Sequence, residues 1–286
     1  MKLIRFGEKG KEKPGVILND GSRKDVSGFT KDFDESFFEN YGIEKFREWL
    51  DDNGQSTPVV SEDVRLGPPV SKPSKIICVG LNYSKHAKES GMALPSEPVI
   101  FFKAPSSLSG PNDDIIIPKN SKKTDWEVEI AIVIGKRALY VEEKDAMNYI
   151  AGYVLHNDVS EREFQLEGSG QWVKGKSADS FAPMGPFIAT KDEIPDPGKL
   201  DLWLKVNGVT MQSSDTSDLI FKISFLVSYI SRFMSLLPGD IISTGTPSGV
   251  GLGLKPPRYL KPGDVVELGV EGLGTAKQNV KAWQPE

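Results

Sequence analysis

The sequence predicts an α+β protein in which strands predominate. Its apolar residues fall mainly in short runs of the length of a strand, and 28 glycines and 20 prolines are spread between them. These runs do not alternate regularly with helical patterns, which disfavours a doubly wound parallel sheet. The apolar share of 38% and the charged share of 26% are typical of a globular chain and exclude a disordered one.

A small β-rich amino-terminal domain is predicted over residues 1–70, followed by a larger domain over residues 71–286. Residues 2–6 and 15–18 are expected strands, and residues 19–21 carry the Asn-Asp-Gly sequence of a hairpin turn. Residues 37–51 are expected to be helical. The proline-rich stretch 66–73 has few apolar residues and marks the expected boundary.

The larger domain is expected to contain strands at its apolar runs, namely residues 75–80, 99–103, 127–135, 149–156, 202–206, 240–244 and 265–268. One long amphipathic helix is expected from about residue 217 to residue 237, capped by Thr216 or Ser217 and ended by Pro238. Lys222 and Arg232 interrupt it, so it is interpreted as a core or subunit-interface helix and not as a membrane span.

Charge and cysteine content narrow the function classes. The 35 Lys and Arg against 40 Asp and Glu give a net charge of −5, so a nucleic-acid-binding surface is not expected. Cys78 is the single cysteine, which excludes an internal disulfide and suits a reducing compartment. Because the first residues lack the apolar stretch of a signal peptide, we expect a cytoplasmic protein.

Three carboxylates are the candidate metal ligands. Glu127 and Glu129 lie two residues apart at the start of a predicted strand and share a face, while Asp158 ends another apolar run. Without a cysteine or paired histidines nearby, such a set favours Mg²⁺ or Mn²⁺ over Zn²⁺. The alternative is a solvated acidic edge of the sheet. His156 shares the face of Asp158 and is interpreted as a packing residue behind the ligands.

Further polar residues suggest catalysis on an anion. His86 and Glu89 are three residues apart on a predicted helical turn, where a carboxylate orients an imidazole as a general base. Arg162, Gln165 and Lys176 follow Asp158 and suit an anionic substrate. The alternatives are an exposed helical pair and solvated surface charges.

Two glycine-rich stretches resemble nucleotide-binding loops. Residues 170–177 match the P-loop pattern, but no strand precedes them and no helix is expected to follow, so a phosphate site is rejected. Residues 245–253 follow a credible strand, yet prolines at 256 and 257 exclude the helix of a dinucleotide fold. This loop is interpreted either as a structural turn or as a loop whose backbone, with the Thr246 hydroxyl, approaches a small anion.

Five motifs together resemble the fumarylacetoacetate hydrolase (FAH) superfamily over about residues 71–286. In chain order they are Asn82-Tyr83 with His86 and Glu89, Asp125-Trp126-Glu127-Val128-Glu129, Asn157-Asp158-Val159-Ser160 with Arg162, Lys174-Gly175-Lys176-Ser177, and Ser243-Thr244-Gly245-Thr246-Pro247. Residues 156–165 and the amino-terminal domain are similar to bacterial members of the 2,4-diketo-3-deoxy-L-rhamnonate/L-fuconate hydrolase type.

The resemblance implies a mixed β-roll or sandwich around the site, a homodimer, and Mg²⁺ or Mn²⁺ held by Glu127, Glu129 and Asp158. It implies that His86 and Glu89 activate water, with Lys176 as a further catalytic residue. Four more residues match substrate-binding positions, namely Tyr83, Arg162, Gln165 and Thr246. Asn82 stands where members close to the eukaryotic enzyme carry a carboxylate, so a fourth protein ligand is not implied.

The expected function is therefore metal-dependent hydrolysis of the C–C bond of a 2,4-diketo acid of the acylpyruvate type, such as a 2,4-diketo-3-deoxy sugar acid, with release of pyruvate. The alternatives within the superfamily are decarboxylation of an oxaloacetate-type 2-oxo acid and enol–keto isomerisation. A noncatalytic binding protein is a less favoured alternative. The expected partners are a small anionic 2-oxo acid and a second copy of the chain, without nucleic acid or membrane.

Overall fold

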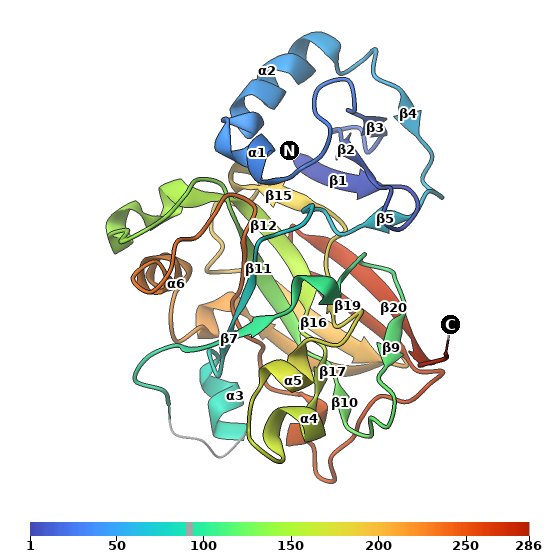
Figure 1. Cartoon of the computed structure of the whole chain (residues 1–286), viewed down its shortest axis with the longest axis vertical. Coiled ribbons are helices and arrows are strands. Elements are labelled where there is room, and N and C mark those ends of the chain that lie inside the picture. The colour runs from blue at the N-terminus through green and yellow to red at the C-terminus, as the bar shows by residue number, and fades with distance from the viewer. Residues whose placement is uncertain (90–93, 286) are drawn as a thin grey trace.

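The computed structural model describes residues 1–89 and 94–285. Most of its strands belong to two sheets (Figure 1). The larger sheet has 11 strands in the order β4-β3-β2-β1-β15-β12-β11-β18-β6-β7, with β5 paired to β1. Its strands are β1 (Lys2–Phe6), β2 (Lys13–Ile17), β3 (Arg23–Asp25), β4 (Val59–Val60), β5 (Leu66–Gly67), β6 (Ile76–Gly80), β7 (Val99–Lys103), β11 (Val128–Ile134), β12 (Ile150–Asn157), β15 (Ile188–Thr190) and β18 (Ile241–Ser243).

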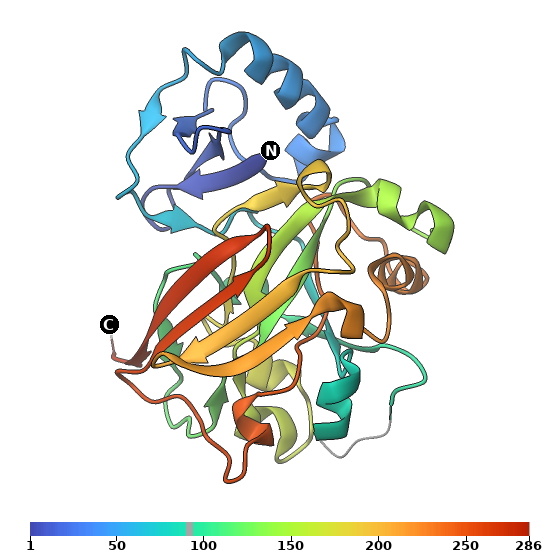
Figure 2. The ribbon, with the colours of Figure 1, turned by 180° about the vertical axis from the view of Figure 1, so that it is seen from behind.

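The smaller sheet has five strands in the order β17-β16-β19-β20-β9 and packs across β11 and β12, as Figure 2 shows from behind. Its strands are β9 (Ile115–Ile117), β16 (Asp201–Val206), β17 (Val209–Asp215), β19 (Val265–Val270) and β20 (Gly274–Ala282). Two short ladders pair β8 (Leu108–Ser109) with β14 (Ala182–Pro183) and β10 (Thr124–Asp125) with β13 (Ser160–Glu161). The predicted α+β class with predominant strands is confirmed.

The expected strands all form, because each apolar run has the length and composition of a buried strand. β11 is buried at every position, as expected for a central strand covered on both faces. Cys78 lies in β6 and is fully buried. The large sheet is mixed, since β11 and β12 are antiparallel whereas β18 and β6 are parallel.

The amino-terminal residues share the main sheet with the rest of the chain. The two expected strands, β1 and β2, pair with each other, and the predicted turn at residues 19–21 joins β2 to its antiparallel partner β3. β1 also pairs antiparallel with β15 through Leu3 and Ile188. One sheet therefore contains strands from both sides of the boundary that is predicted near residue 70. The division into domains 1–70 and 71–286 stays a prediction.

Both long helices differ from their predicted bounds. The helix expected over residues 37–51 is two helices, α1 (Glu35–Glu39) and α2 (Gly42–Asn53), separated by Tyr41 in a left-handed conformation with φ 58°. The helix expected over residues 217–237 is only α6 (Ile223–Ile230), and the prediction that Thr216 or Ser217 caps it is wrong.

The reason lies in tertiary hydrogen bonds before and after α6. Asn82 occupies the backbone amides of Ile220 and Phe221, with distances of 2.8 Å from Ile220 N to the Asn82 carbonyl and 2.7 Å from Phe221 N to Asn82 Oδ1. Beyond α6, Leu236 forms a β-bridge with Ala138. These pairings hold both flanks of the apolar pattern in extended or turn conformations.

The remaining helices are short and border the site. They are α3 (Ser84–Glu89), α4 (Arg162–Leu166) and α5 (Val173–Lys176), with 3₁₀ turns at Pro105–Ser107, Glu143–Tyr149, Lys191–Glu193, Thr216–Asp218 and Gly251–Gly253. Within the described ranges, none of the helices combines the length and the apolar character needed to cross a membrane.

Candidate active site

The three predicted carboxylate ligands meet where β11 begins and β12 ends. The antiparallel register pairs Glu129 with His156, so Glu127 and Glu129 lie beside Asp158, and the Asp158 amide donates to the Glu127 carbonyl at 2.9 Å. All three side chains are buried, and one oxygen from each lies within 4.8 Å of the others. The burial rules out a solvated acidic edge.

Cations hold two of these carboxylates in place. The Lys176 ammonium bridges them, at 2.6 Å from Glu127 Oε2 and 2.8 Å from Asp158 Oδ2. Lys103 donates to the other Asp158 oxygen at 2.5 Å, and Arg162 donates to Glu127 Oε1 at 2.7 Å. Although burial opposes ionisation, Lys103 and Lys176 hold the pKa of the Asp158 carboxyl well below its usual range.

Glu129 differs because no cation pairs with it among the described residues. Its Oε2 accepts hydrogen bonds from Ser243 Oγ at 2.5 Å and from the Gly245 amide at 2.9 Å. Burial, together with the charges of Asp158 and Glu127, raises the pKa of the Glu129 carboxyl well above its usual range. The cluster therefore contains one buried carboxylate without a paired cation among the described residues, which fits a site that binds a divalent metal ion.

The donor chemistry agrees with Mg²⁺ or Mn²⁺, because all three groups offer carboxylate oxygens. His156 is not part of the cluster. Its Nδ1 lies 2.6 Å from Ser243 Oγ, the hydroxyl that donates to Glu129, so His156 supports a ligand from behind, as its position in the sequence suggested.

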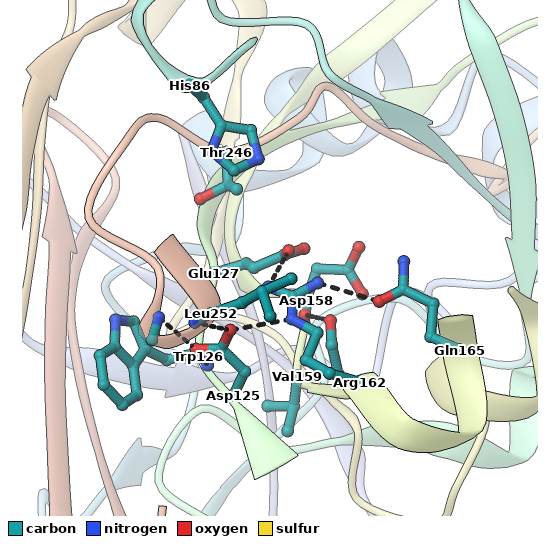
Figure 3. Close-up of polar contacts among 12 residues, drawn as sticks. His86, Asp125, Trp126, Glu127, Asp158, Val159, Arg162, Gln165, Thr246 and Leu252 are labelled. Carbon is teal, nitrogen blue, oxygen red and sulfur yellow. Dashed lines mark hydrogen bonds and ion pairs between the residues drawn. The ribbon is translucent and has the colours of Figure 1, made fainter. Parts of the chain in front are cut away.

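His86 and Glu89 form the expected pair on α3. His86 Nδ1 lies 3.4 Å from Glu89 Oε2, and the Glu89 carboxylate also accepts from the Gly249 amide at 3.0 Å. Partial burial raises the pKa of the Glu89 carboxyl. The hydrogen bonds with His86 and Gly249 and the His86 charge lower it by more, so the net shift is downward. Figure 3 shows His86 and Thr246 on one side and the Glu127, Asp158 and Arg162 group on the other.

One cavity of about 530 Å³ joins the pair to the carboxylates. Its lining includes eight of the ten predicted site residues, namely His86, Glu89, Glu127, Glu129, Arg162, Gln165, Lys176 and Thr246. Asp158 lies behind this lining in contact with Lys176. The structure does not bring Tyr83 to the cavity: its side chain is fully buried, and its hydroxyl has no hydrogen-bond partner within the described part of the chain.

Arg162, Gln165 and Thr246 are tied to neighbouring groups. Arg162 donates from Nε to Asp125 Oδ2 at 2.8 Å and from Nη1 to Gln165 Oε1 at 3.0 Å. Thr246 donates its hydroxyl to the Val128 carbonyl at 2.9 Å. These contacts fix the orientation of the cavity wall, and no described residue accepts a hydrogen bond from the Gln165 amide nitrogen.

The glycine-rich loop at residues 245–253 directs its backbone amides at carboxylates of the protein itself. Gly245 donates to Glu129, Gly249 to Glu89, and Gly251 to Asp125 Oδ1 at 2.7 Å. The loop therefore orients Glu129, which is a candidate metal ligand, together with Glu89 and Asp125. These contacts give the loop the structural role that was one of the two interpretations from sequence, and the Thr246 hydroxyl is likewise bound within the protein. The approach of the loop to a small anion stays a prediction.

The second glycine-rich stretch forms no phosphate loop. Residues 170–177 follow α4 and not a strand, and α5 has only four residues. Lys176, the lysine of the pattern, points to Glu127 and Asp158.

Asn82 does not join the carboxylate cluster, because its amide donates to the Phe221 and Thr244 carbonyls at 3.1 and 2.8 Å.

Three contributors to the site were not assigned from the sequence. Lys103 ends the apolar run of β7 and is buried against Asp158. Asp125 clamps Arg162 and is fully buried. Trp172 lines the cavity between α4 and α5. A lysine at the end of an otherwise apolar strand was the available signal for Lys103, whereas the position of Trp172 depends on tertiary packing.

Comparisons with known proteins place the chain in a family. Residues 75–281 match the family described as fumarylacetoacetate (FAA) hydrolase C-terminal. A provisionally named hydrolase of Burkholderia multivorans (strain ATCC 17616 / 249) is 49% identical, and the match covers 99% of each chain. The fumarylacetoacetate hydrolase of psychrophilic Exiguobacterium antarcticum is 36% identical with a TM-score of 0.86, over 99% of this chain and 100% of that one.

Two further solved structures are similar over nearly the whole length. The maleylpyruvate hydrolase of Sphingobium sp. SYK-6, solved with manganese(II) and pyruvate, is 29% identical with a TM-score of 0.83, over 99% of this chain and 100% of that one. The 5-carboxymethyl-2-hydroxymuconate delta-isomerase of Mycobacterium smegmatis is 34% identical with a TM-score of 0.76, over 100% of both chains. The sequence match and the shared fold together show that this chain belongs to the fumarylacetoacetate hydrolase family.

Proposed function

We propose that the protein is a divalent-metal-dependent hydrolase that cleaves the C–C bond between the two carbonyls of a 2,4-diketo acid and releases pyruvate. The observation that carries this proposal is the placement of the His86–Glu89 pair and the carboxylate cluster on one cavity. Cleavage by water requires both a base and a site that anchors a 2-oxo acid. The manganese and pyruvate in the related maleylpyruvate hydrolase support the same assignment.

Glu127, Glu129 and Asp158 would hold Mg²⁺ or Mn²⁺, which when bound supplies a Lewis acid for the oxygens of a 2-oxo acid. Lys176 and Arg162 fix the ligand oxygens through the contacts described above and offset part of their negative charge. A bound divalent ion would supply the positive charge that an anionic substrate needs. The amide nitrogen of Gln165 donates to substrate, because its oxygen is already occupied by Arg162.

His86 removes the proton from water. Glu89 faces Nδ1 and holds a proton there, which leaves Nε2 with a free lone pair toward the cavity. A water activated at Nε2 attacks the distal carbonyl carbon, the bond between that carbon and C3 breaks, and the proton held by His86 passes to C3 of the departing pyruvate. General-base assistance of this kind typically accelerates a reaction about 10²- to 10⁴-fold.

Enol–keto isomerisation is the second candidate, because the related isomerase of Mycobacterium smegmatis shares the fold over the full length. The two reactions differ in their products, since an isomerase releases no pyruvate. Decarboxylation of an oxaloacetate-type acid would release carbon dioxide together with pyruvate.

A substrate screen tests the assignment. Protein stripped of metal with a chelator is incubated with acylpyruvates, oxaloacetate and 2,4-diketo-3-deoxy sugar acids, with and without Mg²⁺ or Mn²⁺, and pyruvate and carbon dioxide are followed. We expect pyruvate from a 2,4-diketo acid only when the metal is restored. Full activity in excess chelator, or turnover of oxaloacetate alone, would contradict the proposal.

We also propose that the protein is a cytoplasmic homodimer. Leu139, Tyr140 and Phe233 are large apolar side chains that are strongly exposed beside α6, and Tyr140 and Ser231 are joined by a backbone hydrogen bond. A second copy would cover them. We expect light scattering at micromolar concentration to give twice the chain mass of 31.4 kDa, and a monomer would contradict the proposal.

A further inference from the structure

The active-site cavity has an apolar wall that the proposed chemistry does not use. Besides the residues discussed above, the side chains that line it are nearly all aliphatic or aromatic: Val79, Leu81, Phe101, Leu166, Trp172, Val250, Leu252, Leu254 and Pro257. Two of these side chains, Leu166 and Leu252, are 46% and 39% exposed and so remain available to a ligand at the cavity rim. The cavity volume of about 530 Å³ exceeds what pyruvate fills.

Trp172 is the largest of these side chains, and its ring is held from two sides. Its edge meets the Phe101 ring with centroids 5.3 Å apart at 60°. Its other contact is Gly80, where an added methyl group would come within 2.6 Å of the indole. The absence of a side chain at Gly80 therefore makes room for the indole.

The apolar wall begins directly beside the charged cluster. The Lys176 ammonium, which bridges Glu127 and Asp158, lies 4.8 Å from the centroid of the Phe101 ring. Phe101 in turn contacts Trp172. A molecule whose 2-oxo acid end lies at the carboxylates would thus extend its far end along these two rings.

The same wall offers few partners to hydroxyl groups. Among the described lining residues outside the charged cluster and the His86–Glu89 pair, the polar side-chain groups are those of Gln165, Thr246, Lys255 and Trp172. The Gln165 oxygen already accepts from Arg162 and the Thr246 hydroxyl already donates to the Val128 carbonyl, so few groups remain for hydroxyls along the apolar wall. A polyhydroxylated chain placed here would lose water without gaining matching hydrogen bonds, which is unfavourable. An alkyl or aryl group would gain from the same desolvation.

We infer that the acyl group beyond the distal carbonyl of the substrate is apolar, and that Trp172 and Phe101 select it. This inference rests on the proposed function and names the substrate class for it. It separates the enzyme from a sugar-acid hydrolase, whose substrate carries hydroxyls at the same position.

The test compares acylpyruvates that differ only in the acyl group. Acetylpyruvate, a series with longer straight alkyl chains, benzoylpyruvate and a 2,4-diketo-3-deoxy sugar acid are assayed with Mg²⁺ by pyruvate release. We expect kcat/KM to rise about two- to fourfold for each added methylene that reaches the wall. We expect benzoylpyruvate to exceed the sugar acid by at least about tenfold.

The variant Trp172→Ala tests whether the apolar wall causes the preference for apolar acyl groups. We expect it to lower the ratio of kcat/KM for benzoylpyruvate to that for acetylpyruvate by about tenfold, whereas Trp172→Phe keeps most of the ratio. The ratio corrects for any disturbance of Lys176, which lies in the adjoining helix α5. Trp283→Ala is the matched control, because Trp283 is 45% exposed and lies outside the cavity.

The outcomes separate the two proposals. If no 2,4-diketo acid releases pyruvate, the proposed function itself is wrong. If acetylpyruvate is hydrolysed but the sugar acid is preferred, or if Trp172→Ala leaves the benzoyl-to-acetyl ratio unchanged, the proposed function stands and the apolar substrate class is overturned.

Discussion

At the scale of single residues, the three carboxylates of the cluster have different surroundings. Asp158 and Glu127 are each bound by two cationic side chains, whereas Glu129 relies on a hydroxyl and an amide. The negative charge that no described cation balances therefore lies on Glu129. Burial and the neighbouring carboxylates also raise the pKa of the Glu129 carboxyl, so the protein opposes its ionisation.

Glu129→Gln should weaken Mn²⁺ binding by at least about tenfold, because it removes the charge that no protein cation balances. The metal-free variant should be as stable as the wild type or more stable, since one buried like charge is lost. Titration calorimetry with Mn²⁺ and thermal unfolding in chelator measure the two effects. Wild-type Mn²⁺ affinity in the variant would remove Glu129 from the ligand set.

His86→Ala should lower the rate of hydrolysis by about 10²-fold or more, while Mn²⁺ affinity stays close to wild type. The reason is that His86 lies on the cavity without contacting the carboxylate cluster. Glu89→Gln should reduce the rate less, because Glu89 orients the ring and does not itself receive the proton. Hydrolysis at the wild-type rate in His86→Ala would require another base.

Sequence reasoning worked best where the spacing along one strand or one helical turn brings the residues together. Glu127, Glu129 and Asp158 follow from the alternation of β11 and from the end of β12, and His86 and Glu89 follow from a single helical turn. Lys103, Asp125 and Trp172 depend on how separate elements meet, so local pattern gave them no role. Tyr83 lies within a family motif, but its side chain is buried in the core and its backbone forms an isolated bridge with Leu219.

At the scale of elements, the glycine-rich loop between β18 and the turn at Gly251–Gly253 links the His86–Glu89 pair to the carboxylate cluster. Its amides bind Glu129 and Glu89 at positions only a few residues apart. At Gly253 an added methyl group would lie 2.6 Å from Cδ of Glu89, which is the end of a flexible side chain. The protein can fold around such a change only by moving that carboxylate.

Gly253→Ala should therefore lower kcat by about tenfold or more while leaving Mn²⁺ affinity unchanged, because it displaces Glu89 from His86 and spares Glu129. Steady-state kinetics and calorimetry separate the two quantities. Gly28→Ala is the matched control, since its nearest neighbour is a Trp49 atom at 4.0 Å and it lies far from the site. Equal kcat in Gly253→Ala and wild type would show that the close approach has no effect on catalysis.

Secondary structure was predictable where burial and local pattern agree. The apolar runs of β6, β7, β11 and β12 became strands close to their expected bounds. The helix around α6 was overestimated because helical spacing continues through residues 217–237, whereas Asn82 and Ala138 pair with the backbone on either side. Such pairings come from distant parts of the chain and override local propensity.

At the scale of the whole molecule, Arg65 connects the amino-terminal module to the rest of the chain. It donates to both Asp113 oxygens, at 2.7 and 2.6 Å, and to Glu12 Oε1 at 2.9 Å. The Arg65 and Gly110 hydrogen bonds outweigh partial burial and lower the pKa of the Asp113 carboxyl. Asp113 therefore stabilises the fold in its charged form.

Asp113→Asn should lower the free energy of unfolding by about 1–2 kcal/mol at pH 7, because the bidentate charged pair is lost. A depressed pKa in the folded state gives stability that is complete above the unfolded-state pKa and is lost as pH falls through the folded-state pKa. The difference between variant and wild type should therefore shrink below about pH 4. Urea unfolding at pH 7 and pH 3 checks this, and an equal difference at both would exclude the charge as the cause.

The pairing of β1 with β15 means that the amino-terminal module shields the rim of the catalytic body's sheet. Without residues 1–70, the Ile188 and Ala189 side of β15 would become an uncovered edge strand, next to the β12 strand that leads to Asp158. Uncovered edges recruit strands from other molecules and lead to aggregation. We therefore expect residues 1–70 to protect this edge from pairing with other molecules, and a chain shortened to residues 71–286 would need a replacement for that cover.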